Sequence, residues 1–83
     1  MSKYDPLHKY LTDIPAVQTD VTQRFTDLER ILGERLPASA RAHRPWWSNE
    51  AGGSHVQAHA WVQAGWRVDC VDLAGEWVRF RRA

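Results

Sequence analysis

The chain of 83 residues contains five tryptophans, and four of them lie in the stretch from Ser39 to Trp66. Large aromatic side chains bury more area than any others. A chain of this length has room for one domain with one small core, and it buries only about 60 to 65 per cent of its unfolded surface. We therefore predict a single domain over residues 1–83, organised around this tryptophan-rich stretch.

The spacing of apolar residues predicts helices around a small sheet. The expected helices cover residues 5–14, 26–33, 39–44 and 54–65. Their expected N-caps are Asp5, Thr26 (in a capping box with Glu29), Ser39, and Ser54 (in a capping box with Gln57). Residues 21–25 alternate as a strand, and the polar Gln23 in its middle favours the edge of a sheet over its centre.

The end of the chain is expected to form a β-hairpin. Residues 66–73 and 77–81 alternate as strands, and Ala74 with Gly75 forms the turn between them. On the second strand the apolar Val78 and Phe80 point one way, while Trp77, Arg79 and Arg81 point the other way. On the first strand, apolar parity changes after Cys70, which indicates a β-bulge. Cys70 itself is expected in the core.

These elements predict an α+β fold with three to four helices, a short N-terminal strand and a C-terminal hairpin. Their order resembles a winged helix-turn-helix, in which the short strand pairs with the C-terminal wing and the domain binds DNA. The insertion of residues 45–53 makes the turn between helices longer than is typical. Which helix would read the DNA is therefore left open.

The chain also resembles a family of small uncharacterised bacterial proteins over nearly its whole length. The resemblance rests on Tyr4-Asp5-Pro6-Leu7, Phe25 with Glu29-x-Ile31-Leu32-Gly33, Leu36-Pro37-x-Ser39-Ala40, His43-Arg44-x-Trp46-Trp47-Ser48-Asn49, His55-x-Gln57-Ala58-x-Ala60-Trp61 and Gly65-Trp66-x-Val68. This combination is specific, but the family brings no activity that could be carried over. A hydrophobic residue would be the usual choice where this chain has Gln23.

Composition favours a cytoplasmic protein. Cys70 is the only cysteine, so no disulfide can form within the chain. The sequence has no apolar run long enough for a membrane span and no basic-then-apolar leader. Charge is uneven along the chain: residues 1–34 carry four Lys/Arg and six Asp/Glu, and residues 35–83 carry seven Arg and four Asp/Glu. Arginine pairs with phosphates through a planar fork, so this bias favours nucleic acid.

The first functional hypothesis is binding of double-stranded DNA, with no catalytic activity, cofactor or metal. The hypothesis rests on the arginine-containing segment between Arg35 and Asn49, which has no acidic residue and precedes a helix with a polar stripe. The expected phosphate contacts are Arg41, Arg44, Arg79 and Arg81. Asn49, His55, Gln57 and His59 are expected near the bases, and the predicted DNA-binding surface also includes His43, Trp47 and Ser48.

Three alternatives remain open. The chain could be a protein-binding module that exposes Trp46, Trp47 or Trp77 as an anchor. The paired Trp46 and Trp47 could instead close the core, which a small domain needs. His55 and His59, four residues apart, could bind zinc together with His43, although no glutamate stands beside the helical histidines as a base. A monomer or a homodimer would fit equally well.

Overall fold

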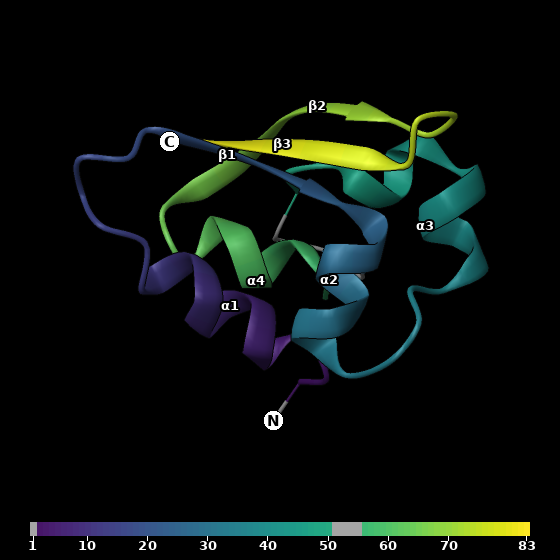
Figure 1. Ribbon diagram of the computed structural model, residues 1–83, viewed down its shortest axis with the longest axis horizontal. Helices are drawn as coiled ribbons and strands as arrows, with labels where there is room; N and C mark the ends of the chain where they lie inside the picture. Colours follow the sequence, from purple (N-terminus) through teal and green to yellow (C-terminus); the bar gives the residue numbers. More distant parts are fainter. Residues whose placement is uncertain (1, 51–55) are drawn as a thin grey trace.

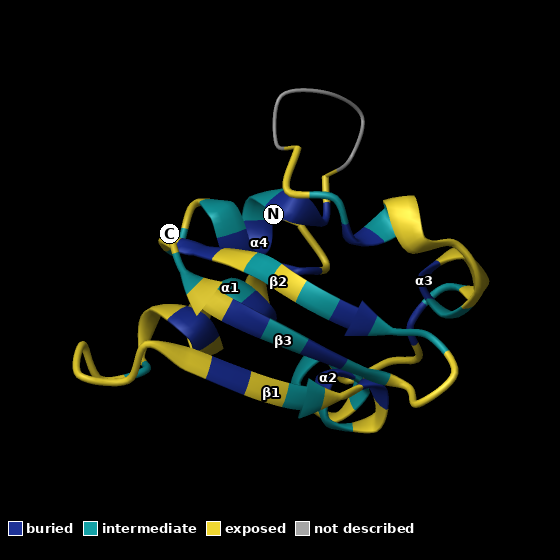
Figure 2. Cartoon of the chain, turned by 90° about the horizontal axis from the view of Figure 1, so that it is seen from above, coloured by how far each residue is buried: buried dark blue, intermediate teal, exposed yellow. Residues whose placement is uncertain are grey.

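Three antiparallel strands form a sheet that helices cover on one face only (Figures 1 and 2). The computed structural model describes residues 2–50 and 56–83. Its elements are α1 (Asp5–Thr12), β1 (Asp20–Arg24), α2 (Phe25–Leu32), α3 (Ala38–Ala42), the 3-10 helix η1 (Arg44–Trp47), α4 (Ala58–Val62), β2 (Trp66–Asp72) and β3 (Trp77–Arg82). The predicted α+β class with a C-terminal hairpin is confirmed. Among the described residues, no helix is long and apolar enough to cross a membrane.

The N-terminal strand pairs with the last strand of the hairpin. The order of strands is β1, β3, β2, so β1 and β2 are the two edges of the sheet. Asp20 lies opposite Arg81 and Arg24 lies opposite Trp77 in the antiparallel register of β1 and β3. The prediction of an edge strand that pairs with the C-terminal hairpin is therefore confirmed, one residue earlier in the chain than expected.

The core lies between the sheet and the helices α1, α2 and α4 (Figure 1). Val78 and Phe80 of β3 are fully buried on this side, as their alternation predicts. Gln23 of β1 also faces the helices, where its amide donates a hydrogen bond to the hydroxyl of Tyr10 at 2.6 Å. This partner on α1 explains how a polar residue is accommodated in the middle of the strand.

Aromatic rings join the layers of the core. Trp47 of η1 stacks on Phe25 of α2 and on Trp61 of α4, with centroid distances of 5.2 and 6.1 Å. Trp61 in turn lies 5.7 Å from Phe80 of β3. Trp46 is half-buried and meets Trp47 edge-on. The interpretation as a core residue is therefore correct for Trp47, and Trp46 packs against the core while staying partly exposed.

The buried indoles all donate hydrogen bonds. Trp47 donates to the carbonyl of Ala40 at 2.8 Å, and Trp66 donates to the carbonyl of Leu11 at 3.0 Å. Trp61 donates to the side-chain oxygen of Asn49 at 3.1 Å. Because a buried donor without a partner costs about 1 to 3 kcal/mol, these acceptors are part of what fixes the fold.

The predicted N-caps of three helices were wrong. Tyr4, and not Asp5, precedes α1. At α2, the Asp27 carboxylate accepts a hydrogen bond from the backbone N–H of Arg24, so the box expected from Thr26 and Glu29 does not form. Pro37 precedes α3, which leaves Ser39 inside the helix.

The helix α4 is shorter than predicted. It covers Ala58–Val62, and the capping box expected from Ser54 and Gln57 lies partly outside the described residues. Gln57 is 6% exposed, and its amide donates to the carbonyl of Trp46 at 2.9 Å. Because Ala58, Ala60 and Trp61 are also buried, most of this short helix belongs to the core.

The predicted bulge is present in β2. The pairing register with β3 shifts between Val68 and Cys70, so that Cys70 lies opposite Arg79 and Val71 lies opposite the buried Val78. The shift turns Cys70 to the face away from the helices. Its expected place in the core is therefore wrong, because the bulge reverses the parity of every residue after it.

Candidate binding surface

The face of the sheet that points away from the helices carries a mixed set of charged, polar and aromatic side chains. No described segment lies across it (Figure 2). We call it the outer sheet face. Its members are Asp20, Thr22 and Arg24 from β1, Arg67, Asp69, Cys70 and Asp72 from β2, and Trp77, Arg79 and Arg81 from β3.

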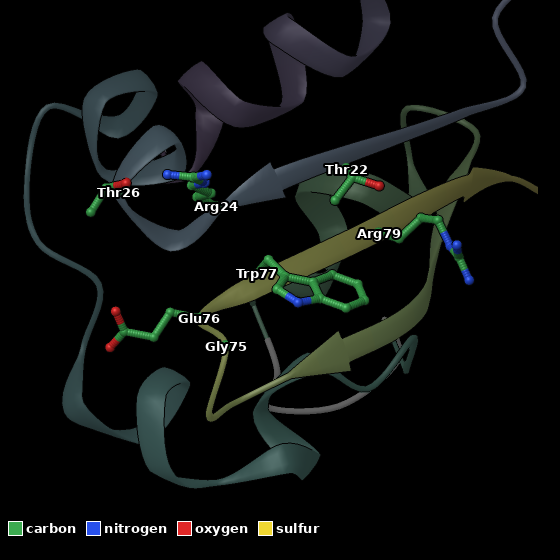
Figure 3. A pocket seen from close by; sticks show the side chains of 7 residues that line it. All are labelled: Thr22, Arg24, Thr26, Gly75, Glu76, Trp77 and Arg79. Carbon is green, nitrogen blue, oxygen red and sulfur yellow. The ribbon is translucent and has the colours of Figure 1, made fainter.

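Trp77 lies in a shallow groove on this face, as Figure 3 shows. The groove has a volume of about 540 Å³ and is lined by Thr22, Arg24, Thr26, Gly75, Glu76, Trp77 and Arg79. A Cβ atom at Gly75 would stand 2.9 Å from the Trp77 indole and 3.0 Å from the Asp72 carboxylate. The glycine therefore lets the ring lie against the hairpin turn, where it stays partly exposed.

The charges on the outer sheet face are only partly paired. The Asp69 carboxylate accepts hydrogen bonds from the Arg79 guanidinium at 3.1 Å, and it lies 3.9 Å from the guanidinium of Arg81. Within the described residues, Arg24 and Arg67 make no ion pair. The face thus offers an aromatic ring with both free and neutralised cations around it.

Arg41 is neutralised by two acids that are far from it in sequence. Its guanidinium donates to the carboxylates of Glu29 and Glu76, each at 2.8 Å. The Arg41 hydrogen bond, followed by the backbone N–H of Leu36, holds the pKa of Glu29 below its ordinary value, and the pair raises the pKa of Arg41. The premise that nothing acidic neutralises this arginine segment was therefore wrong.

Arg44 and Asn49 bind the edge of β2. Arg44 donates to the carbonyl of Val71 at 2.6 Å. The Asn49 side chain accepts from the N–H of Val68 at 2.7 Å and donates to the carbonyl of the same residue at 3.0 Å. Asn49 thus pairs with β2 as a neighbouring strand would. These two side chains, which were predicted to contact DNA, instead hold the segment before α4 against the edge of β2.

The remaining predicted contacts are spread over different parts of the molecule. Trp47 is 3% exposed and cannot reach a partner. Ser48 accepts a hydrogen bond from the N–H of Glu50, which is a local turn contact. His43 is exposed between α3 and η1, and His55 lies outside the described residues. Of the predicted set, Arg79 and Arg81 are the pair that the structure places on the outer sheet face.

His59 faces another groove, between α1 and α4. This groove has a volume of about 930 Å³, and His8, Lys9, Val56 and Gln63 also line it. The ring of His59 pairs with the amide of Gln63 at 2.9 Å. The Nδ1 atom of His8 lies 3.3 Å from the carbonyl oxygen of Ala60. Within the described part of the chain, no three potential metal ligands come together.

Sequence reasoning missed Thr22, Arg24 and Arg67 as members of the surface. The signal was present for β1, because Val21 is apolar and the strand period of two places Thr22 and Arg24 on the opposite face. The signal was present for Arg67 as well, because it lies before the bulge, and the apolar Trp66 and Val68 on either side of it place it on the outer face. The hairpin residues Trp77, Arg79 and Arg81 were assigned to the outer side correctly.

A family model described as a domain of unknown function, DUF7662, matches residues 4–83. This confirms the expected resemblance to an uncharacterised family. No curated protein and no solved structure matches the chain. The winged-helix resemblance therefore stays a prediction.

Proposed function

Since the chain belongs to the DUF7662 family, whose function is unknown, we propose from its surface that it is a protein-binding module. The outer sheet face is the contact surface, and Trp77 is its anchor. The observation that carries the proposal is the partly exposed Trp77 indole in a groove on an otherwise uncovered sheet. A catalytic step is not part of the proposal.

The chemistry around Trp77 supports a protein partner. Tryptophan and arginine are the residues most enriched in the energetic centres of protein interfaces, where polar residues form the surrounding rim. Trp77 has Arg24 and Arg79 beside it in the groove, together with the hydroxyl of Thr22. The acids Asp20, Asp69 and Asp72 lie on the same face. A surface of mixed charge is complementary to a partner protein whose own surface carries both positive and negative side chains.

A library of random extended peptides, displayed on phage and selected on the purified protein, tests the proposal. We expect selected peptides to bind with micromolar affinity and Trp77→Ala to weaken that binding at least about tenfold, the loss of a hot-spot side chain. Val17→Ala is the matched control, because Val17 is 90% exposed in the loop before β1 and lies outside the groove. Selected peptides that bind both variants equally, or no peptides at all, would overturn the proposal.

Binding of double-stranded DNA is the second candidate, and one observation favours it. Arg24 and Arg67 carry no ion pair within the described residues, and Arg81 is exposed with its nearest acid at 3.9 Å. These three cations and Arg79 all lie on the outer sheet face. In a winged helix, the C-terminal hairpin contacts the DNA backbone. The pairing of Arg41 and Arg79 with acids is the reason for placing this candidate second.

Mobility shifts with pooled random duplexes at low salt distinguish the two candidates. If DNA is the partner, the affinity falls steeply with salt, and Arg81→Ala lowers the salt slope by about one unit because one phosphate contact is lost. Arg35→Ala is the control, since Arg35 is exposed and lies away from the outer sheet face. Absence of any shift at low salt removes this candidate.

A cytoplasmic location and a winged-helix relationship belong to the same proposal. The single cysteine, Cys70, forms no disulfide within the chain, which fits a reducing compartment. The pairing of β1 with the C-terminal hairpin is the feature of the fold that agrees with a winged helix. The short and largely buried α4 makes the hairpin, and not a helix, the part of such a domain that would contact a partner.

A further inference from the structure

The two edge strands of the sheet, β1 and β2, differ in how far other segments of the chain cover them. Along β2, the Asn49 side chain pairs with both backbone groups of Val68, and Arg44 donates to the carbonyl of Val71. Along β1, no described segment lies beside the middle of the strand (Figure 2). An unprotected edge strand is a template for pairing with another chain.

The hydrogen bonds to β3 determine which backbone groups of β1 point outward. The N–H of Arg82 donates to the carbonyl of Thr19, and the N–H of Phe25 donates to the carbonyl of Glu76. In an antiparallel ladder, alternate residues face the neighbouring strand, so positions 19, 21, 23 and 25 point toward β3. The N–H and C=O of Thr22 therefore point out of the free edge.

Thr22 is also the centre of a self-complementary arrangement of charges. Asp20 and Arg24 stand two residues before and two residues after it, and both are exposed. Within the described residues, neither side chain makes an ion pair. When a strand pairs antiparallel with its own copy about Thr22, Asp20 comes opposite the partner's Arg24, and Arg24 comes opposite the partner's Asp20.

We propose that the chain forms a two-fold symmetric dimer in which β1 pairs antiparallel with β1 of a second copy, centred on Thr22. The N–H of Thr22 donates to the carbonyl of the partner's Thr22, and the same bond forms in the opposite direction. Directly opposed residues in such a pair have Cα atoms about 5.5 Å apart, within reach of an ion pair between aspartate and arginine. Each copy thus supplies a backbone donor, a backbone acceptor, a carboxylate and a guanidinium that pair with the same groups of the other copy.

The dimer extends the candidate binding surface. A two-fold axis perpendicular to the sheet joins two three-stranded sheets into one, with both outer faces on the same side. The groove around Trp77 then gains the partner's Asp20 beside Arg24, which lines it. The inference concerns association of the chain with itself, so it goes beyond the proposed function and does not depend on it.

Sedimentation equilibrium of the full chain without any ligand tests the proposal. Pairing of such short strands buries less than a standard interface, so we expect a weak dimer, resolved over about 10 μM to 1 mM. Asp20→Arg and Arg24→Asp each replace two attractive pairs by two repulsive ones, and each should raise the dissociation constant at least about tenfold. Glu34→Arg, at an exposed position away from β1, is the matched control.

The decisive experiment mixes the two charge variants. Asp20→Arg and Arg24→Asp restore opposite charges across the axis only when one copy of each pairs, so an equimolar mixture should dimerise within about threefold of the unmodified chain. Circular dichroism of each variant shows that it is folded. A folded chain that stays monomeric up to about 1 mM, or a dimer that both substitutions leave unchanged, would overturn the proposal. So would a mixture that associates no better than the single variants.

Discussion

The segment from Arg41 to Asn49 and the outer sheet face contain the same kinds of residue, but the fold uses them in opposite ways. In the segment, Arg41 binds two acids, Trp47 is buried, and Asn49 completes the edge of β2. On the outer sheet face, Trp77 lies partly exposed in a groove beside Arg24, for which the described residues hold no acid partner.

The difference teaches that residue type alone does not identify a binding surface in so small a domain. Arginine, asparagine and tryptophan have long or branched side chains with several donors, which suits them to hold loops to a sheet as well as to hold a partner. In this chain, most such side chains of the segment from Arg41 to Asn49 contact the core or the β2 edge, where they stabilise the fold. Substitutions at Trp47, Asn49, Gly75 and Glu29 test that contrast.

The largest expected effect separates the two tryptophans. Trp47→Ala removes a ring that stacks on Phe25 and Trp61, so it should lower the free energy of unfolding by about 4 kcal/mol. Trp77→Ala removes a partly exposed ring and should cost about 1 kcal/mol or less. Urea unfolding followed by far-ultraviolet circular dichroism measures both. Equal costs would show that Trp77 is as structural as Trp47.

A second prediction concerns the side chain that completes the β2 edge. Asn49→Ala leaves the buried Trp61 indole without its acceptor and the backbone of Val68 without both partners. The expected cost is about 2 to 3 kcal/mol, since at least one buried donor is left unsatisfied. Glu50→Ala, at the exposed neighbouring position, serves as the control and should be nearly neutral. If both variants unfold at the same urea concentration, Asn49 has no such role.

A third prediction tests how the groove on the outer sheet face is built. Gly75→Ala places a Cβ atom 2.9 Å from the Trp77 indole, so the ring has to move out of its place against the turn. Such crowding should cost about 1 kcal/mol in unfolding free energy. It should also shift the near-ultraviolet circular dichroism of the tryptophans, whereas Ala74→Ser at the exposed neighbour leaves the spectrum unchanged. An unaltered spectrum in Gly75→Ala would contradict this placement of Trp77.

The smallest expected effect comes from the ion pair of Arg41 with Glu29. Because Arg41 lowers the pKa of Glu29 in the folded chain, the pair stabilises the fold above the ordinary pKa of 4.5. This contribution is lost as the pH falls below that value and the carboxylate becomes protonated. At such a partly exposed pair it is worth about 0.5 to 1 kcal/mol.

Glu29→Gln provides the comparison for this pH dependence. The amide keeps an oxygen that can accept from the N–H of Leu36, but it has no charge to pair with Arg41. Its unfolding free energy should therefore fall less steeply than that of the unmodified chain between about pH 5 and pH 3. Parallel curves would mean that the pair does not contribute.

Local residue patterns predicted the order of the helices and strands, apart from the 3-10 helix η1, which lies where an insertion in a turn was expected. Alternation in β3 predicted that Val78 and Phe80 share one face and Trp77 lies on the other, because the period of a strand is a local property. The change of apolar parity in β2 predicted the bulge for the same reason. The left-handed stop at Gly33, with a φ of 76°, also follows from residue type alone.

Packing between segments that are distant along the chain sets which polar side chains have partners within the fold. The partners that occupy Arg41 and Asn49 lie 35 and 19 residues away along the chain, at Glu76 and Val68. A pattern within one segment cannot reveal such partners, because they are brought together by the packing of α3, η1 and the hairpin against one another. The self-complementary edge of β1 emerged in the same way, once its pairing with β3 had fixed which groups point outward.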